Sequence, residues 1–538
     1  MYVNRSSKKF SNTADIHKQE HEKWNRRSFL KALGMVGGGS MMLANTRITA
    51  SKPSLLTNAI SDSITDRILV LVRLKGGNDG LNTIVPIYDY DNYANLRPTI
   101  RHFESSLFKL DQDFGIPGSM SNLQSMWGDG AMKVVHGVGY ENQSLSHFKS
   151  SDIWASSDDS DEEDSGYLGR YFEEIHPDFL ANPPEIPAAI QIGSIGNLTF
   201  DGRGVLNYAM TVANPEQLRR IAENGALHGL DDIPDCTYGE RLEFLRSMTN
   251  NTFTYGEVIG EKYSLGSNSV AYLDDNLGKQ FSIIARMIKG GLGTRVYMIS
   301  LGGFDTHGNQ IDRHNELMLS VSHGIKTFYE DLSAAGMEKN VLTTTVSEFG
   351  RRARENGSEG TDHGTSAPVM LFGPALDDNG FIGEHPSLSN LDRRDNMTNT
   401  FDYKEVYANL MKEWLCIDPE TVDRALLGNS FEPNSDFGIT CAGLIEPIDS
   451  FVKFNHEVIQ GEDGSTWLFF EKGDTSHVNI TLFSITGAKI ATLYDDVFGP
   501  GSEQINVSQK VGGKLNQAIY VYRILSGNKS FSNQLFVR

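Results

Sequence analysis

The feature that most constrains the fold is a series of short, continuously apolar runs, at residues 68–74, 132–139, 295–301, 341–346 and 369–373. Runs of this kind are typical of strands that are buried on both faces of a sheet. Helical periodicity lies between them, because apolar residues recur on one face of 273–288 and of 317–332. This alternation predicts an α/β fold over residues 65–440, with a mostly parallel sheet and helices on both of its faces.

Polar motifs follow three of these runs directly. They are "KGGNDGLN" after residue 74, "GGFDTHGNQ" after residue 301 and "SEFGRR" after residue 346. In parallel sheets, ligands bind beyond the carboxyl ends of the strands. The sequence therefore predicts that the chemistry of this chain gathers at that edge of the sheet.

The candidate ligands are carboxylates and imidazoles at these strand ends and in the segment "GTDHG" (360–364). They are Asp79, Asp305, His307, Glu348, Asp362 and His363. Such side chains suit a divalent metal ion, with zinc first and manganese or calcium as alternatives. Asp305 and His307 are two residues apart, so in extended structure they share a face. An Asp-x-His pair alone is more often a hydrogen-bonded turn. The metal site is predicted because carboxylates at two other strand ends and glycine-rich flanks accompany the pair.

The segment from 68 to about 416 resembles the domain of unknown function 1501 family of bacterial proteins, which are typically exported by the twin-arginine route. The resemblance is carried by "LKGGNDGLNTIVP", "SLSHFKSSDIW", "GYLGRY", "SLGGFDTHGNQ" and "SEFGRR", followed by "GTDHG". That family is placed in the alkaline phosphatase and sulfatase superfamily, which implies an alkaline phosphatase-like fold and a two-metal site for phosphate or sulfate esters. By position, Asp79 and Glu348 resemble ligands of one metal. Asp305, His307 and His363 resemble ligands of the other.

Two features of the chain depart from the superfamily pattern. Phosphatases of the superfamily carry Asp-His where this chain has Glu348-Phe349, so one nitrogen ligand is absent unless Asp362 or His147 replaces it. Sulfatases mature a nucleophile from Cys-x-Pro-x-Arg or a serine equivalent, a context that none of the cysteines has. The three cysteines, Cys236, Cys416 and Cys441, allow one disulfide at most.

A hydroxyl nucleophile for an anionic ester is expected at a helix N-terminus, where free amide groups also bind the anion. The segment "ENQSLSHFKSSDIWAS" (141–156) fits, because Ser144 or Ser146 would cap a helix that begins near His147. We predict Ser146 as the nucleophile and His147 as a proton carrier or metal ligand, with an ordinary capping serine as the alternative. Arg351 is predicted to clamp a phosphoryl or sulfuryl oxygen, unless it pairs with the nearby Glu348.

Two further features are expected to be structural. His136 lies near the end of a predicted strand, away from the polar motifs. The acidic run "SSDDSDEEDS" (156–165) lacks the ligand spacing and the glycine of a calcium loop. We expect this run to be a solvated insertion, with calcium binding as the alternative.

The N-terminal 50 residues resemble a twin-arginine leader. "NRRSFLK" (25–31) follows a basic stretch and precedes a glycine-rich, weakly apolar segment that reaches about residue 44. The alternative, a basic amphipathic helix, is disfavoured because each glycine costs about 1 kcal/mol relative to alanine. Residues 1–50 are therefore predicted to engage the twin-arginine export machinery and to be removed from the mature protein.

The C-terminal residues 455–538 show the short alternating pattern of strands. In "VNITLFSITGAKIATL" (478–493) apolar and polar residues alternate before a glycine turn, and "AIYVYRILSGNKSFSNQLFVR" (518–538) repeats the design. This predicts a small β-sandwich. It resembles the sorting domain that ends cargo proteins of the type IX secretion system, which implies that machinery as a partner and a location at the cell surface or outside the cell after periplasmic transit. A carbohydrate-binding or spacer sandwich is the alternative.

Charge and hydropathy exclude two classes of partner. The chain has a net charge of −21, whereas nucleic-acid binding requires clustered Lys and Arg. No apolar run is long enough to predict a transmembrane span in the mature protein. We therefore expect an exported, metal-dependent hydrolase of phosphate or sulfate esters, acting on an anionic small molecule or glycan. The alternatives are a non-catalytic surface binding or scaffolding protein that retains the superfamily fold, and a polysaccharide-binding surface protein.

Overall fold

The computed structural model describes residues 66–441 and 455–537. Short gaps fall at 178, 180–182, 194–196, 204–205, 226–227 and 230–236 in the first range, and at 461–464, 473–474, 485–488, 500, 514, 516–517 and 527–528 in the second. These residues form two compact units, an α/β unit and a C-terminal β unit, which divide after Cys441. The predicted leader and Cys236 lie outside the described residues.

The α/β unit is built on a nine-stranded sheet with the strand order β13-β5-β12-β9-β1-β8-β6-β7, and β14 also pairs with β5. Its strands are β1 (Ile68–Lys75), β5 (Met132–Gly139), β6 (Ala189–Ile192), β7 (Ala209–Val212), β8 (Val296–Gly302), β9 (Val341–Val346), β12 (Ala367–Phe372), β13 (Gly380–Ile382) and β14 (Phe401–Asp402). All neighbours run parallel except β12, which is antiparallel to both β5 and β9. The five predicted strands and the mostly parallel sheet are confirmed.

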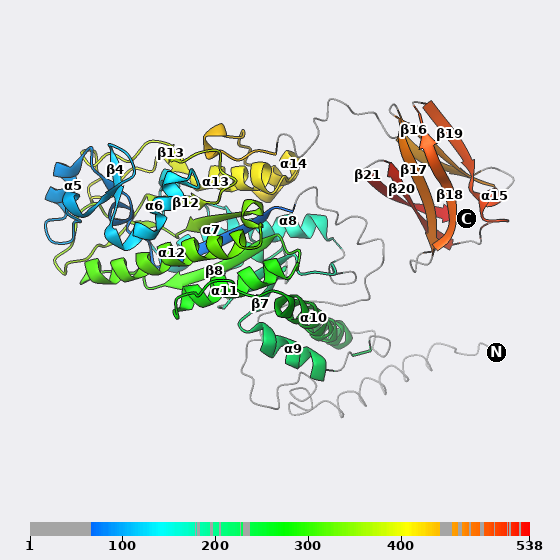
Figure 1. The fold of residues 1–538 in the computed structure, drawn as a ribbon, viewed down its shortest axis with the longest axis horizontal. Coiled ribbons are helices and arrows are strands. Elements are labelled where there is room, and N and C mark those ends of the chain that lie inside the picture. The colour runs from blue at the N-terminus through cyan, green and yellow to red at the C-terminus, as the bar shows by residue number, and fades with distance from the viewer. Residues whose placement is uncertain are drawn as a thin grey trace, which may run out of the picture. The chain divides into compact units, whose positions relative to one another are not determined.

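Helices cover both faces of this sheet, as predicted (Figure 1). Val70 and Val72 of β1 pack into a core with α10 (Thr237–Leu265), α11 (Asn276–Lys289) and α12 (Gln310–Ser333). Leu69 and Leu71 pack on the opposite face with α7 (His147–Ser156), α8 (Tyr167–Ile175), α13 (Tyr403–Asn409) and α14 (Pro419–Ala425). Alternate residues of one strand thus serve two separate cores.

Shorter elements complete the α/β unit. They are α4 (Gly80–Thr83), β2 (Val85–Pro86), α5 (Tyr90–Leu96), β3 (Phe108–Lys109), β4 (Phe114–Ile116), α6 (Gln124–Gly128), α9 (Pro215–Asn224), β10 (Gly350–Arg351) and β11 (His363–Gly364), with a π-helical turn at Leu410–Trp414. The strands β2, β4 and β3 form a small sheet, and β10 pairs with β11. The β10–β11 pair folds the segment 350–364 back on itself.

The direction of β12 decides which loops meet. β12 is antiparallel to its neighbours, so its first residue lies at the edge where β1, β5, β8 and β9 end. The segments after Lys75, Gly139, Gly302 and Val346 therefore converge with the segment that precedes Ala367. We call this edge of the sheet the carboxyl edge.

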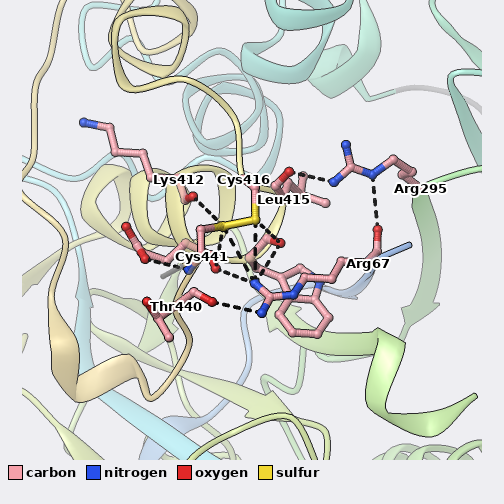
Figure 2. The surroundings of a disulfide bond; sticks show 9 residues. Arg67, Arg295, Lys412, Leu415, Cys416, Thr440 and Cys441 are labelled. Carbon is pink, nitrogen blue, oxygen red and sulfur yellow. Dashed lines mark hydrogen bonds between the residues drawn. A yellow bond between two sulfur atoms is a disulfide. The ribbon is translucent and has the colours of Figure 1, made fainter. Parts of the chain in front are cut away.

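A disulfide joins Cys416 and Cys441 near the opposite edge of the sheet (Figure 2). Arg67, at the start of β1, donates to the carbonyls of Glu413 (2.8 Å) and Thr440 (2.9 Å), so it bridges the two chain segments that the disulfide links. Its guanidinium also lies over the Trp414 ring, 4.6 Å from the ring centroid. The disulfide and Arg67 together fasten the last segment of the α/β unit to the beginning of β1, its central strand.

The acidic run 156–165 links α7 to α8 and is anchored at several points. The Asp158 carboxylate accepts hydrogen bonds from the amides of Ser160 (3.0 Å), Glu162 (2.9 Å) and Glu163 (2.9 Å). Asp159 pairs with the largely buried Lys404 at 2.6 Å. The acids of the run are exposed or half-buried, as expected of a solvated insertion, while the backbone and one lysine also contact two of its carboxylates.

The C-terminal unit consists of two antiparallel sheets around one apolar core. One sheet has the order β15 (Asn455–Gln460), β16 (Thr466–Lys472), β19 (Gly501–Asn506), and the other β18 (Lys489–Phe498), β17 (Ser476–Ser484), β20 (Ala518–Ser526), β21 (Lys529–Val537). A short helix, α15 (Val507–Lys510), follows β19. Side chains from both sheets, such as Phe470, Ile480 and Ile505, share the core. The small β-sandwich predicted for this region is confirmed.

Within the described residues, no helix combines the length and the apolar composition that crossing a membrane requires.

Candidate functional site

Three side chains from three different loops meet at the carboxyl edge. His147 begins α7 after β5, Asp305 follows β8, and His363 lies in β11 ahead of β12. Each offers one ligand atom, and these atoms all lie within 4.8 Å of one another. Among the described residues this is the group of His, Cys, Asp and Glu side chains with the spacing of a metal site.

Three imidazole Nε2 atoms surround the Asp305 carboxylate. His363 Nε2 is 2.9 Å and His307 Nε2 is 3.0 Å from Asp305 Oδ1, while His147 Nε2 is 3.4 Å from Oδ2. The two atoms His307 Nε2 and His363 Nε2 are themselves 2.9 Å apart. Nitrogen and oxygen atoms that converge in this way match the ligand set of a zinc site.

The opposite ring nitrogen of each histidine faces an acceptor. His147 Nδ1 lies 3.1 Å from Glu348 Oε1, and His363 Nδ1 lies 2.8 Å from the Leu145 carbonyl. Carboxylates and carbonyls can only accept, so Nδ1 is the donor; Nε2 then either donates to Asp305 from the protonated ring or offers the lone pair of the neutral ring to a cation. His307 Nδ1 faces Asp362 Oδ1 at 3.5 Å. The surroundings therefore fix the tautomer that turns Nε2 toward Asp305, as outer partners do in zinc sites.

The electrostatics keep this carboxylate charged. Desolvation acts to raise the pKa of Asp305, but hydrogen bonds from Arg351 and His363 and the charge of Arg351 outweigh it, and the pKa lies well below its ordinary value. The hydrogen bond to Glu348 raises the pKa of His147, and burial lowers that of His363. A charged carboxylate among three imidazoles offers an oxygen ligand to a cation.

Glu348 lies directly behind His147. Its Oε1 accepts the Gly76 amide at 2.7 Å as well as His147 Nδ1, while its Oε2 is buried and has no hydrogen-bond partner among the described residues. The sequence resemblance implied that Glu348 is a metal ligand. In the structure Glu348 instead holds the imidazole that reaches the cluster.

Asp79 is taken up by a buried ion pair away from this cluster. Its Oδ2 lies 2.6 Å from Arg97 Nη1, and Gln310 also donates to it. Burial acts to raise the pKa of Asp79, but the charge and hydrogen bond of Arg97 hold it below its usual value. The other oxygen of Asp79, Oδ1, is buried and has no hydrogen-bond partner among the described residues, so the implied pairing of Asp79 and Glu348 around a second metal stays a prediction.

Arg351 does not face a substrate. Its guanidinium is fully buried and donates to the carbonyls of Gly76, Gly77, Phe304 and Thr361 and to Asp305 Oδ1, which is 2.8 Å away. These acceptors occupy the donors of the side chain, so the structure does not support the expected clamp on a phosphoryl or sulfuryl oxygen. Arg351 ties the loops after β1 and β8 together and orients Asp305.

Ser146 occupies the N-cap position of α7, with an exposed side chain that makes no capping hydrogen bond. The predicted helix begins at His147, and the amide groups of its first turn lie beside the cluster because His147 belongs to both. The Ser146 hydroxyl is therefore not used by the helix that it caps. Its neighbour Phe148 is 87% exposed.

Phe349 fills the place behind the imidazoles. Its ring is completely buried, with its centroid 4.9 Å from that of His147 and 4.7 Å from that of His363. Gly77 permits this packing, because a Cβ there would lie 2.4 Å from the Phe349 ring and the residue has a φ of +83°. The close packing beneath the site therefore requires a glycine at position 77, the second glycine of "KGG" in the first motif.

The remaining predicted residues take subsidiary places. Asp362, which is 43% exposed, pairs with Arg352 at 3.1 Å and faces His307. His136 is buried and stacks on Phe381, with ring centroids 4.9 Å apart, away from the cluster. Burial lowers the pKa of His136 to about 3, so it is a neutral core side chain.

Sequence reasoning missed the partners that sort these residues into different roles. Arg97, which pairs with Asp79, lies in a segment with no motif of its own, whereas Gln310, which also donates to Asp79, ends the motif "GGFDTHGNQ" and had no predicted role. The roles of Phe349 and Gly77 were also missed, although the double glycine was visible in the sequence. A buried arginine 18 residues from an acid leaves no periodic signal.

Comparison with known families gives one match. A family model described as "Protein of unknown function (DUF1501)" matches residues 260–433. The matched segment contains Asp305, His307 and His363 together with Glu348 and Asp362. Asp79 and His147 lie outside it. No curated protein matches the chain.

Several solved structures are distantly similar to the chain. The lipoteichoic acid synthase LtaP of Listeria monocytogenes is 8% identical, with 79% of this chain and 88% of that chain covered and a TM-score of 0.29. The alkaline phosphatase of the Antarctic bacterium TAB5 is 10% identical, with coverages of 59% and 94% and a TM-score of 0.27. A protein of the alkaline phosphatase superfamily from Vibrio parahaemolyticus is 8% identical, with coverages of 90% and 88% and a TM-score of 0.29.

Proposed function

We propose that this chain is an exported, metal-dependent hydrolase of phosphate or sulfate esters. The observation that carries the proposal is the convergence of three imidazole Nε2 atoms on the Asp305 carboxylate, with the tautomers of His147 and His363 fixed from behind. In the neutral form of the rings, such an arrangement brings their Nε2 lone pairs and the carboxylate together. A divalent cation satisfies it, and zinc suits its nitrogen-rich donors better than calcium does.

We assign the ion to His147, Asp305 and His363, whose ligand atoms lie within 4.8 Å of one another. Three protein ligands leave a position open, as in catalytic rather than structural zinc sites. When bound there, the ion would supply a Lewis acid that polarises an ester oxygen. We therefore expect one metal per chain, because the described residues hold one group of ligand atoms with metal-site spacing.

The substrate would be oriented by the N-terminus of α7. The free amides of its first turn and the positive end of the helix dipole favour an anionic group. Ser146 Oγ, which makes no capping hydrogen bond, would attack the phosphorus or sulfur atom as the bond to the leaving oxygen breaks. Neutral His307, with Nδ1 toward Asp362, would accept the Ser146 hydroxyl proton at Nε2 and pass it to the leaving oxygen, and a water would then cleave the seryl ester and restore the hydroxyl.

Metal analysis and a substrate panel test this proposal. We expect the full chain, loaded with zinc, to retain one equivalent and to hydrolyse members of a panel of phosphate and sulfate monoesters and diesters. Asp305→Ala removes both zinc and turnover, whereas His307→Ala keeps zinc and loses turnover. Wild-type protein that is folded but holds no zinc under these conditions contradicts the proposal.

The proposed export rests on two features of the chain. The leader-like segment 25–31 supports the twin-arginine route, and the C-terminal sandwich supports sorting by the type IX machinery to the cell surface or beyond. The Cys416–Cys441 disulfide is in keeping with such a location, because disulfides persist in oxidising compartments. Fractionation of cells that express the chain with Arg26 and Arg27 replaced by lysine tests this route, since the variant is expected to stay in the cytoplasm.

A non-catalytic binding protein is the second candidate, favoured by one observation. Phe349 stands where related phosphatases carry a histidine, and it packs its ring on His147 and His363. An apolar side chain there removes a donor and limits the space around the ion. Under this candidate the chain binds zinc and anionic esters, yet the ester panel yields no turnover with any loaded metal.

A further inference from the structure

A small cavity lies beneath the candidate site, between the sheet and α7. It is lined by Arg73 at the end of β1, by Ser151 of α7 and by Ser347 and Glu348 after β9. Its volume is about 20 Å³, and roughly 10–15 Å³ is enough to hold one water molecule. The rest of the lining is mostly apolar, so Arg73, Ser151, Ser347 and Glu348 would be the main polar partners of such a water.

Two charged side chains of opposite sign line this cavity. Arg73 Nη2 donates to Ser151 Oγ at 2.8 Å, and its guanidinium is close enough to Glu348 to feel the charge of that carboxylate. Glu348 Oε2 is buried and has no partner among the described residues. A buried carboxylate oxygen without a hydrogen bond is costly, so a water at this point has a clear energetic role.

Both side chains also hold the same helix. Glu348 Oε1 contacts His147 and Arg73 contacts Ser151, and these two residues lie four apart, on one face of α7. The Ser150 hydroxyl adds a hydrogen bond of 2.5 Å to the Glu348 carbonyl. The first turns of α7 are therefore fastened to the ends of β1 and β9 at neighbouring points.

We propose that Arg73 is a positioning residue of the site: through a water held in this cavity it fixes Glu348, and Glu348 in turn fixes the ring and tautomer of His147. The inference deepens the proposed function and rests on it, because it gives a reason why His147 presents Nε2 to the metal. Arg73 touches neither the metal nor the substrate. It acts through the Glu348 carboxylate.

Zinc affinity of the full chain measures this role. Loss of an outer partner of a ligand costs roughly 10- to 100-fold in metal affinity. We expect Arg73→Met, which removes the charge at similar length, to weaken zinc binding by about that factor in chelator competition. Arg73→Lys restores part of the affinity. Ser151→Ala, which removes one hydrogen bond and leaves the charge, is the matched control and changes the affinity little.

Two results separate a positioning role from a purely structural one. If Arg73→Met lowers the urea midpoint of the metal-free chain but binds zinc as tightly as the wild type, the inference is overturned. A crystal structure of the wild-type chain is the second readout, with one ordered water expected within hydrogen-bond distance of Arg73 and Glu348 Oε2. A direct Arg73–Glu348 contact, or an empty cavity, contradicts the water link. Should the wild type bind no zinc, the proposed function fails, and this second readout still decides the inference.

Discussion

Arg97 Nη1 lies 2.6 Å from Asp79 Oδ2, and both side chains are almost completely buried. This ion pair assigns Asp79 a structural task. It neutralises the acid in the first glycine-rich motif and leaves the metal chemistry to residues from other strand ends. The difference matters, because a two-metal site and a one-metal site at this edge predict different stoichiometries.

Asp79→Ala is expected to destabilise the fold and to leave the metal in place. Breaking a buried pair by removing one partner costs about 3–5 kcal/mol, because the other charge stays buried and uncompensated. Urea unfolding measures the loss, and elemental analysis measures zinc in the still-folded protein. Arg97→Met should destabilise in the same way, since it leaves the carboxylate without its partner. A variant that folds with wild-type stability but loses zinc would make Asp79 a ligand.

Ser146→Ala is expected to abolish turnover without changing stability or zinc content. The hydroxyl makes no capping hydrogen bond, so its loss costs less than the roughly 1 kcal/mol of an ordinary N-cap. The measurements are the ester panel, the urea midpoint and the zinc content. Ser144→Ala is the matched control, because Ser144 lies two residues earlier and should keep activity. Full activity in Ser146→Ala would move the nucleophile elsewhere.

Opening the Cys416–Cys441 disulfide is expected to lower stability by about 3–4 kcal/mol, given its sequence separation of 25 residues. The bond lies at the starts of β1 and β8, away from the carboxyl edge, so the zinc affinity of the folded protein should not change. Cys416→Ala/Cys441→Ala and the reduced wild type should agree in their urea midpoints. Equal midpoints for oxidised and reduced protein would show that the link does not constrain the chain.

Acidification below neutral pH is expected to destabilise the protein through its buried and half-buried histidines. Burial lowers the pKa of His136 to about 3. It lowers the pKa of four further histidines to about 4, namely His102, His176, His314 and His385. In the unfolded chain these groups titrate near 6.5. Between the two values the unfolded state binds more protons, so the free energy of unfolding falls as the pH falls.

His136→Phe isolates one of these contributions. The ring already stacks on Phe381, so phenylalanine fits the site without a titrating group. For His136 alone the loss between pH 7 and pH 5 is about 2 kcal/mol. Urea midpoints at the two pH values should therefore move less in the variant than in the wild type. An unchanged difference between the two midpoints would mean that His136 does not titrate in this range.

Much of the fold was predictable because apolar runs report burial directly. The strands at 68–74 and 341–346 and the helix periods of 273–288 and 317–332 correspond to β1, β9, α11 and α12. The reversed direction of β12 left no sequence signal, although it is what carries His363 to the carboxyl edge. Strand direction depends on how the whole chain packs.

The site was predictable as a set of residues and not as a set of roles. The grouping of Asp305 and Glu348 follows from strand ends that share an edge. The tasks of Glu348 and Arg351 depend on acceptors and charges contributed by distant segments, such as the Gly76 amide and the Thr361 carbonyl. Contacts of this kind involve backbone groups, which every residue carries, so they are invisible in a list of side chains.

The most direct test of the account is the number of zinc ions per chain in the full-length protein after loading and removal of free metal. We predict one equivalent in the wild type, one in folded Asp79→Asn, and none in Asp305→Ala. Two equivalents in the wild type, of which one is lost in Asp79→Asn, would contradict the single site. Retention of zinc by Asp305→Ala would contradict the cluster itself.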